Sequence, residues 1–472
     1  MKKGLLILIL PIIFLFILIV FMVLRHRVAE KTTDENRTVY IKKTETGYQL
    51  IRNGMPFYIK GASGSTQLRE LAEIGGNTIR VYDTINLENV LNEAEKNNLA
   101  VIVDIYIPRF QTDYNPYSDE EFNTVLKENL RKFINRYKTH PAILFWNLGN
   151  ELDYPTLLQK KRRIPDFNDL SNIFRIFTER RSFIRTFNEL IEIIQQEDIN
   201  HPVSTSVSTH HFWKRLLSIH INSPKLDIIG YNIFAPPVKM KSQLDNLSFF
   251  IKLLPYYISE WGTEGPWAQE HTAWRAPLET TSTNKGEQYR ENHAILTREY
   301  GESLGSTVFY WGQKQERTHT WFNIFDEEGR KSQVYYELQK IWKGENGHLN
   351  LPPQIKYMLV NDKGAKDNLV FPPDETVRAK VIMDSKMDTT LQFIWEIHDE
   401  GWNYAGGGVA HDPTNIIFTQ IENIHENEIL FKAPALEGAY RLFVHINDKY
   451  GNFATTNTPF YVLNTNEKLP SN

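Results

Sequence analysis

The strongest constraint on the fold is an alternation of short apolar runs with longer amphipathic ones. Strand-like apolar runs are centred near residues 59, 79, 103, 144, 205, 229, 258 and 308, and helix-like segments separate most of them. This order predicts parallel strands with helices outside. Eight such units predict a (β/α)8 TIM barrel, which typically takes about 250 residues. A doubly wound open sheet is the alternative, but it leaves the eighth strand and the helix expected at residues 334–343 without a natural place.

Beyond Pro352 and Pro353 the sequence changes to short β-rich runs with turn residues between them. The runs include TVRAKVIMD, TLQFIWEIH, GAYRLFVHIND and PFYVL. This pattern predicts an antiparallel β-sandwich of about 110 residues. We therefore expect four parts: a membrane anchor and tether (1–37), the barrel (38–348), the β-sandwich (349–466) and a disordered tail (467–472).

The N-terminus reads as a transmembrane helix. Residues 4–24 contain no charged side chain, and Lys2, Lys3, Arg25 and Arg27 flank them. Such a run is long enough to cross a hydrocarbon core of about 30 Å. Because no small-x-small cleavage pattern follows it, we expect a retained anchor and not a removed signal peptide. Because basic residues flank both ends, their distribution does not predict which end of the helix faces the cytoplasm.

Composition excludes several kinds of site. The formal net charge of −4 gives no basic excess, so we expect no nucleic-acid partner. The chain has no cysteine, which rules out disulfides, thiolate metal sites and a cysteine nucleophile. It has neither a HExxH helix nor another run with metal-ligand spacing, and the glycine-rich KGASGS lacks the GK[ST] ending of a phosphate loop. We therefore expect no metal and no cofactor.

Two glutamates follow apolar runs at the expected ends of strands four and seven. Glu151 comes after PAILFWNLGN, and Glu260 lies near the end of PYYISEWG. In such barrels the C-terminal ends of the strands carry the chemistry, so both side chains are expected at one cleft. Glycoside hydrolysis needs two carboxyl groups, and at about 5 Å apart one attacks the sugar while the other protonates the leaving oxygen. The alternative for Glu151 is an acid at the start of a surface loop.

The stretches NTIRVYD, HPAILFWNLGNE, YYISEWG and VFYWG together carry a family resemblance. They resemble the clan A retaining glycosidases built on (β/α)8 barrels, most closely the barrel domain of glycoside hydrolase family 2 and the β-1,3-glucanosyltransferases. The resemblance covers roughly residues 50–345 and implies that Glu151 is the acid/base and Glu260 the nucleophile. It also implies that Asn150 holds the sugar 2-hydroxyl, Arg80 orients the nucleophile and Trp311 forms the floor of the sugar subsite.

Two of these roles have simpler alternatives. A guanidinium keeps a neighbouring carboxylate ionised, which suits Arg80, but the same residue could form a salt bridge at the barrel mouth without catalytic use. Sugars pack well on indole rings, which suits Trp311, but a tryptophan ending an apolar strand could equally belong to the core.

One position departs from the family pattern. In the relatives, strand six usually carries a tyrosine two residues after an asparagine or histidine, and its hydroxyl touches the nucleophile. Here the residue two positions after the substrate-binding candidate Asn232 is Phe234, which has no hydroxyl. Tyr231 does not replace that hydroxyl, because neighbouring strand residues point to opposite faces. How the nucleophile is held is therefore open.

The sequence thus predicts a membrane-anchored retaining β-glycoside hydrolase or transglycosylase that acts on a polysaccharide or oligosaccharide outside the cytoplasm. Hydrolysis and transfer differ only in whether water or another sugar resolves the glycosyl-enzyme. The alternative is a non-catalytic glycan-binding relative, in which Phe234 would mark lost chemistry.

Overall fold

A computed structural model of the chain describes residues 36–45, 47–109, 115–156, 170–209, 211–234, 237–344, 350–384, 390–400 and 414–464. The chain forms two compact units. The first comprises Met1–Ala72, Gly76–Trp261 and Ile295–Val308, and the second comprises Glu73–Gly75, Gly262–Ala294 and Phe309–Asn472. The boundary predicted at residues 348 and 349 follows the change of sheet type, whereas the second compact unit also includes segments that precede it.

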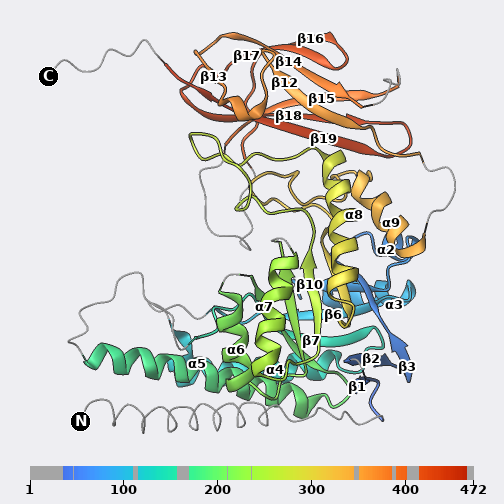
Figure 1. The fold of residues 1–472 in the computed structure, drawn as a ribbon, viewed down its shortest axis with the longest axis vertical. Helices are drawn as coiled ribbons and strands as arrows, with labels where there is room; N and C mark the ends of the chain where they lie inside the picture. Colours follow the sequence, from blue (N-terminus) through green and yellow to red (C-terminus); the bar gives the residue numbers. More distant parts are fainter. Residues whose placement is uncertain are drawn as a thin grey trace, which may run out of the picture. The chain divides into compact units, whose positions relative to one another are not determined.

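The first unit is built on the predicted barrel (Figure 1). Eight parallel strands close on themselves in the order β10-β11-β4-β5-β6-β7-β8-β9. Each of the eight predicted strands is present, and the closure of the sheet excludes the doubly wound alternative. The strands are β4 (Ile59–Gly64), β5 (Thr78–Val81), β6 (Ala100–Ile105), β7 (Ile143–Asn150), β8 (Val203–Ser208), β9 (Ile228–Ile233), β10 (Tyr256–Trp261) and β11 (Gly305–Trp311).

Helices follow the barrel strands in the chain, and their sequences explain where they form. One face of α3 is buried through Leu87, Val90, Leu91 and Ala94, at the spacing of an amphipathic helix. Asp119 caps α4 by accepting backbone N–H bonds from the first turn. The helices are α2 (Leu68–Glu73), α3 (Leu87–Lys96), α4 (Glu120–Tyr137), α5 (Leu170–Glu197), α6 (Phe212–Asn222), α7 (Pro237–Phe250), α8 (Ser282–Glu299) and α9 (Gln333–Lys343), with 3-10 turns η1 (Pro116–Ser118) and η2 (Ala365–Asp367).

A small antiparallel sheet packs against the N-terminal end of the barrel. It consists of β1 (Val39–Lys43), β2 (Tyr48–Arg52) and β3 (Met55–Phe57). Its apolar side chains share one buried cluster with residues near the starts of barrel strands, including Ile59, Ala100, Leu144 and Ile228. This cluster fills one end of the barrel, and the polar candidates lie near the other ends of the strands.

The second unit contains the predicted β-sandwich, drawn in orange and red in Figure 1. One sheet has the order β12-β14-β17-β16 and the other β13-β19-β18-β15. Apolar residues of both sheets form a single core, which is what holds a sandwich together. The strands are β12 (Ile355–Val360), β13 (Val370–Phe371), β14 (Thr376–Met383), β15 (Gln392–Asp399), β16 (Ile421–His425), β17 (Glu428–Lys432), β18 (Gly438–Asn447) and β19 (Phe453–Val462).

In the part of the chain that the structure describes, no helix is both long and apolar enough to cross a membrane. The predicted transmembrane helix at residues 4–24 lies outside the described residues, as does the predicted tail at residues 467–472.

Candidate active site

Glu151 lies in a sharp turn directly after β7. Its backbone has a left-handed φ of 50°, and its N–H donates to the carbonyl of Ser206 on β8 at 2.9 Å. Gly149 precedes the turn with a φ of 75°, and a Cβ atom there would lie 2.5 Å from a methyl carbon of Leu152. Only glycine adopts this conformation without strain. The LGN sequence before the glutamate therefore shapes the turn that positions it.

Glu260 is nearly buried on β10, with 5% of its surface exposed. One of its carboxylate oxygens, Oε1, accepts two hydrogen bonds: from Arg80 Nη1 at 3.0 Å and from Tyr82 Oη at 2.7 Å. Both donors come from the end of β5 or directly after it. The carboxylate is thus held by one charged and one neutral donor.

Arg80 is fully buried and connects several strands. Besides Glu260, it donates to both carboxylate oxygens of Asp104 on β6, at 2.9 and 2.7 Å, and to the backbone carbonyl of Ser259 at 2.8 Å. Burial by itself lowers the pKa of the guanidinium, but the charge of Asp104 and other neighbours raises it well above its ordinary value. A buried charge is tolerated when it is paired and fully hydrogen-bonded in this way.

Two asparagines connect Arg80 to Glu151. Asn150 Oδ1 accepts from Arg80 Nη2 at 2.9 Å and from Asn232 Nδ2 at 3.2 Å, and Asn232 Nδ2 also donates to Glu151 Oε1 at 3.0 Å. Ser259 Oγ donates to the amide oxygen of Asn232 at 2.7 Å, which orients its NH2 group toward the glutamate. Five of the six predicted site residues therefore lie in one hydrogen-bonded network within the first unit.

Tyr82 is a member of this network that the sequence analysis missed. Burial raises the pKa of its hydroxyl well above the ordinary value, although Arg80 acts in the opposite direction, so the hydroxyl stays protonated and donates to Glu260. A tyrosine hydroxyl thus reaches the glutamate from a different strand than the one that carries Phe234. The signal was present in NTIRVYD, where residues 80 and 82 are two apart and share a face of an extended chain.

Asp104 was also missed. It lies in the apolar strand AVIVDI and is 4% exposed. Its two hydrogen bonds with Arg80 fix the plane of the guanidinium. A single acid inside an otherwise apolar strand is the pattern that could have revealed it.

Trp311 is the last residue of β11, whose residues from Phe309 onward fall in the second unit, and it is fully buried. Its ring packs edge-on against Phe325, with centroids 4.9 Å apart, and at 6.0 Å from Tyr335. These surroundings are those of a core residue, and the ring has no exposed face to offer a sugar. We therefore do not include Trp311 in the candidate site.

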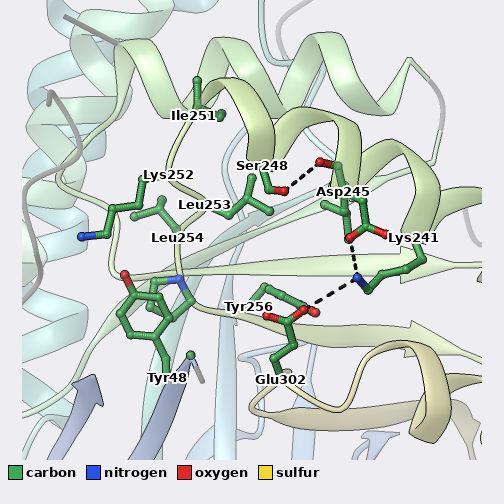
Figure 2. Close-up of a pocket in the computed structure, with 13 residues that line it drawn as sticks. Tyr48, Lys241, Asp245, Ser248, Ile251, Lys252, Leu253, Leu254, Tyr256 and Glu302 are labelled. Carbon is green, nitrogen blue, oxygen red and sulfur yellow. Dashed lines mark hydrogen bonds and ion pairs between the residues drawn. The ribbon is translucent and has the colours of Figure 1, made fainter. Parts of the chain in front are cut away.

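A pocket of about 770 Å³ lies elsewhere in the first unit, where α7 leads into β10 (Figure 2). Lys241 lies there between Asp245 and Glu302 and is 3.7 Å from the latter. Tyr256 lines the pocket at the start of β10, whereas Glu260 is four residues further on. At ~3.3 Å per residue this is a separation of about 13 Å, so the pocket is separate from the glutamate network.

No model of a protein family matches the sequence, and no curated protein sequence matches it. Among solved structures, β-glucuronidase 2 of Bacteroides uniformis is similar with 13% identity and a TM-score of 0.49, covering 90% of this chain and 48% of that one.

Two further solved structures are similar over 66% of this chain, each with a TM-score of 0.47. One is a β-D-glucuronidase of Dictyoglomus thermophilum, with 18% identity and 54% of its chain covered. The other is a glycoside hydrolase family 2 β-galacturonidase of Eisenbergiella tayi bound to galacturonate, with 17% identity and 55% covered. The present chain spans about half the length of these structures. The closed barrel is the fold that the predicted resemblance to clan A glycoside hydrolases implies.

Proposed function

We propose that this protein is a retaining β-glycoside hydrolase with Glu260 as the nucleophile and Glu151 as the acid/base. The observation that carries the proposal is the network in which Asn232, Asn150 and Arg80 join the two glutamates at the ends of strands four and seven. Two carboxyl groups near one sugar-binding point are what double displacement at an anomeric carbon requires.

The contacts support this assignment of roles. Glu260 accepts from a buried guanidinium, which compensates a negative charge and favours the ionised form that a nucleophile needs. Glu151 accepts from the neutral amide of Asn232 and is more exposed than Glu260. A carboxyl group in that position is suited to give a proton to a leaving oxygen and to regain one from water.

In the first step, a carboxylate oxygen of Glu260 attacks the anomeric carbon while the bond to the leaving oxygen breaks. The proton of Glu151 passes to that oxygen, and a glycosyl ester of Glu260 remains. In the second step, the Glu151 carboxylate takes a proton from water, whose oxygen attacks the same carbon and releases Glu260. If a sugar hydroxyl replaces water, the same step forms a new glycosidic bond.

The Tyr82 hydrogen bond favours this enzyme over the non-catalytic glycan-binding alternative. That alternative rested on the hydroxyl missing at Phe234, and Tyr82 supplies a hydroxyl to the same glutamate. Its carboxylate therefore has the kind of neutral donor that the family pattern leads us to expect.

The test uses aryl β-glycosides of glucose, galactose, mannose and glucuronic acid, with Glu260→Ala, Glu151→Ala and the exposed Glu88→Ala as control. Loss of general acid catalysis typically costs 10²–10⁴-fold, so we expect Glu151→Ala to fail most with poor leaving groups. Added azide should then give a β-glycosyl azide with Glu151→Ala and an α-glycosyl azide with Glu260→Ala. Unchanged turnover by either glutamate variant contradicts the proposal, and tight binding without any turnover by the wild type supports the binding alternative.

We also propose that residues 4–24 anchor the protein in a membrane and that the barrel acts on a β-linked polysaccharide or oligosaccharide outside the cytoplasm. The uncharged apolar run flanked by basic residues supports this. In cells, the full-length protein should resist alkaline extraction and be degraded by external protease, whereas a variant lacking residues 2–27 should be extracted. Protection of the full-length protein from external protease would contradict the proposal that the barrel lies outside the cytoplasm.

A further inference from the structure

A group of histidines lies in the second unit, on a sheet face that the proposed catalysis does not use. In β15, Trp395 and Ile397 point into the sandwich core, so Glu396 and His398 lie on the opposite face. On β15, Ile394 lies two residues before Glu396 and therefore shares its face. His445 on the paired strand β18 lies directly opposite Ile394, so it lies on that face as well. His319, from the segment after β11, meets these residues there.

The ligand atoms of three of these residues converge. Nε2 of His319 lies 3.3 Å from Nε2 of His445, which in turn lies 3.8 Å from Oε2 of Glu396. All three atoms are within 4.8 Å of one another. Two nitrogens bound tetrahedrally to zinc at 2.0–2.1 Å are about 3.3–3.4 Å apart, which matches the separation of the two imidazoles.

From this geometry we propose that His319, His445 and Glu396 form a binding site for a divalent transition-metal ion, with zinc as the ion that fits best. Two imidazoles and one carboxylate are a ligand set that zinc accepts, with a fourth position left for water. Because His319 lies on a segment separate from the sheet, the ion would join that segment to β15 and β18.

Surrounding side chains hold the three ligands in place. His398 Nε2 lies 3.0 Å from Glu396 Oε2, and its Nδ1 lies 2.9 Å from Thr414 Oγ1. The ring of His319 stacks on those of His398 and His445, with 5.2 Å between centroids in each case, and lies 4.6 Å from Phe443. Such outer partners orient metal ligands and are worth about 10–100-fold in affinity.

The site is also accessible. His319, Glu396 and His445 line a pocket of about 440 Å³, which gives an ion a route of entry. The alternative is a direct hydrogen bond between the two imidazoles, with no ion.

The full-length protein, stripped with a chelator, provides the test. We expect calorimetry to show one zinc ion per chain at neutral pH, Co²⁺ to produce the intense visible bands of a four-coordinate site, and zinc to raise the melting temperature. His319→Ala and His445→Ala should each lose the zinc ion, and His398→Ala should weaken binding about 10–100-fold. His425→Ala is the matched control, because His425 is exposed on β16 of the same unit.

Three results would overturn the proposal: no zinc uptake by the wild type, cobalt bound without those bands, or zinc uptake unchanged in both ligand variants. If the alanine variants do not fold, the cobalt spectrum of the wild type and the zinc uptake of Glu396→Gln still decide whether the site binds a metal ion. Neither measurement depends on glycosidase activity, so the outcome is independent of the proposed function.

Discussion

Oε1 of the buried Glu260 carboxylate is shared between two donors of different kinds, Arg80 Nη1 and Tyr82 Oη. The guanidinium compensates charge, whereas the phenol adds direction without charge. If Glu260 is the nucleophile, as we propose, these two donors fix its orientation before a substrate arrives, which lowers the cost of reaching the transition state. At the residue scale, the hydrogen bonds to this oxygen atom therefore help to orient the glutamate.

Replacing Tyr82 by phenylalanine tests this arrangement. A hydrogen bond to a charged group contributes about 1.5–3 kcal/mol, so Tyr82→Phe should lower kcat/KM by roughly 10–100-fold if the bond is kept in the transition state. Steady-state kinetics on the best aryl glycoside measures the effect, with Tyr106→Phe as control because Tyr106 is 78% exposed. Equal kinetics for wild type and Tyr82→Phe would rule out the positioning role.

At the scale of elements, the ends of strands and helices determine where side chains point. The turn after β7 depends on a positive φ at Gly149 and on close contact with Leu152. Helix α6 depends on His220, whose Nδ1 lies 2.8 Å from the carbonyl oxygen of Leu216 and whose Nε2 accepts the backbone N–H of Leu254 at 3.0 Å. The contact with Leu216 lies within α6, whereas the bond from Leu254 joins the helix to the segment that leads into β10.

Gly149→Ala should destabilise the protein and impair catalysis together. A non-glycine residue in the left-handed region costs about 1–3 kcal/mol, and the new methyl group would also collide with Leu152. Gly54→Ala is a matched control, since Gly54 has a similar φ of 74° but nothing lies within 4 Å of an added Cβ. Urea unfolding of both variants separates the cost of φ from that of the collision. Equal destabilisation would show that the contact with Leu152 is unimportant.

His220 should make stability depend on pH. Burial lowers its pKa from an ordinary value near 6.5 to about 4, so the folded protein holds the neutral ring. Below pH 6.5 the histidine binds a proton in the unfolded chain but not in the folded protein. The contribution of the neutral ring to the free energy of unfolding is therefore complete above pH 6.5 and is lost as the pH falls toward 4. The loss in the free energy of unfolding reaches roughly 3 kcal/mol.

Urea midpoints at pH 7.5, 6 and 5 measure this dependence. His220→Gln should be less stable at pH 7.5 but should lose less stability on acidification than the wild type does. The exposed His425→Gln should follow the wild-type curve. A wild-type and a His220→Gln protein with parallel pH curves would contradict the assignment.

At the scale of the whole molecule, each compact unit is assembled from separate stretches of chain. Within the second unit, Glu279 from residues 262–294 accepts hydrogen bonds from Lys285, from Thr318 and Thr320, and from Asn457 on β19. Burial alone would raise the pKa of Glu279, but Lys285 and the hydrogen bonds lower it, so the carboxylate stays ionised. This buried group connects segments that are distant in sequence.

Glu279→Gln should therefore destabilise the second unit. It leaves the buried Lys285 ammonium without its counter-charge, and loss of one partner of such a pair typically costs about 3–5 kcal/mol. The double variant Glu279→Gln/Lys285→Met should recover part of that loss, because it removes the unpaired charge as well. Thermal unfolding of the three proteins measures the difference. A double variant less stable than the single one would contradict this account.

Much of the architecture could be read from local patterns. The period of apolar residues predicted all eight barrel strands and the β-sandwich. Strands buried in a barrel form nearly continuous apolar runs, whereas strands of a sandwich alternate between apolar and polar residues. That Glu151, Glu260, Arg80, Asn150 and Asn232 lie near one another could be predicted, because each lies near a strand end, where local sequence and barrel geometry together assign a position. Their catalytic and binding roles stay predictions. The transmembrane helix and the tail stay predictions.

The remainder depended on contacts between distant parts of the chain. No local pattern distinguishes a buried Trp311 from an exposed one, or shows that the hydroxyl of Tyr82 reaches Glu260 on a distant strand. His319, Glu396 and His445 have no ligand spacing in sequence, since strand register and the packing of a separate segment bring them together. The sequence by itself determined the elements and the polar residues at their ends, because hydrophobic period and turn chemistry are local. Only the tertiary structure decided which side chains meet, because that depends on register and on closure of the sheets.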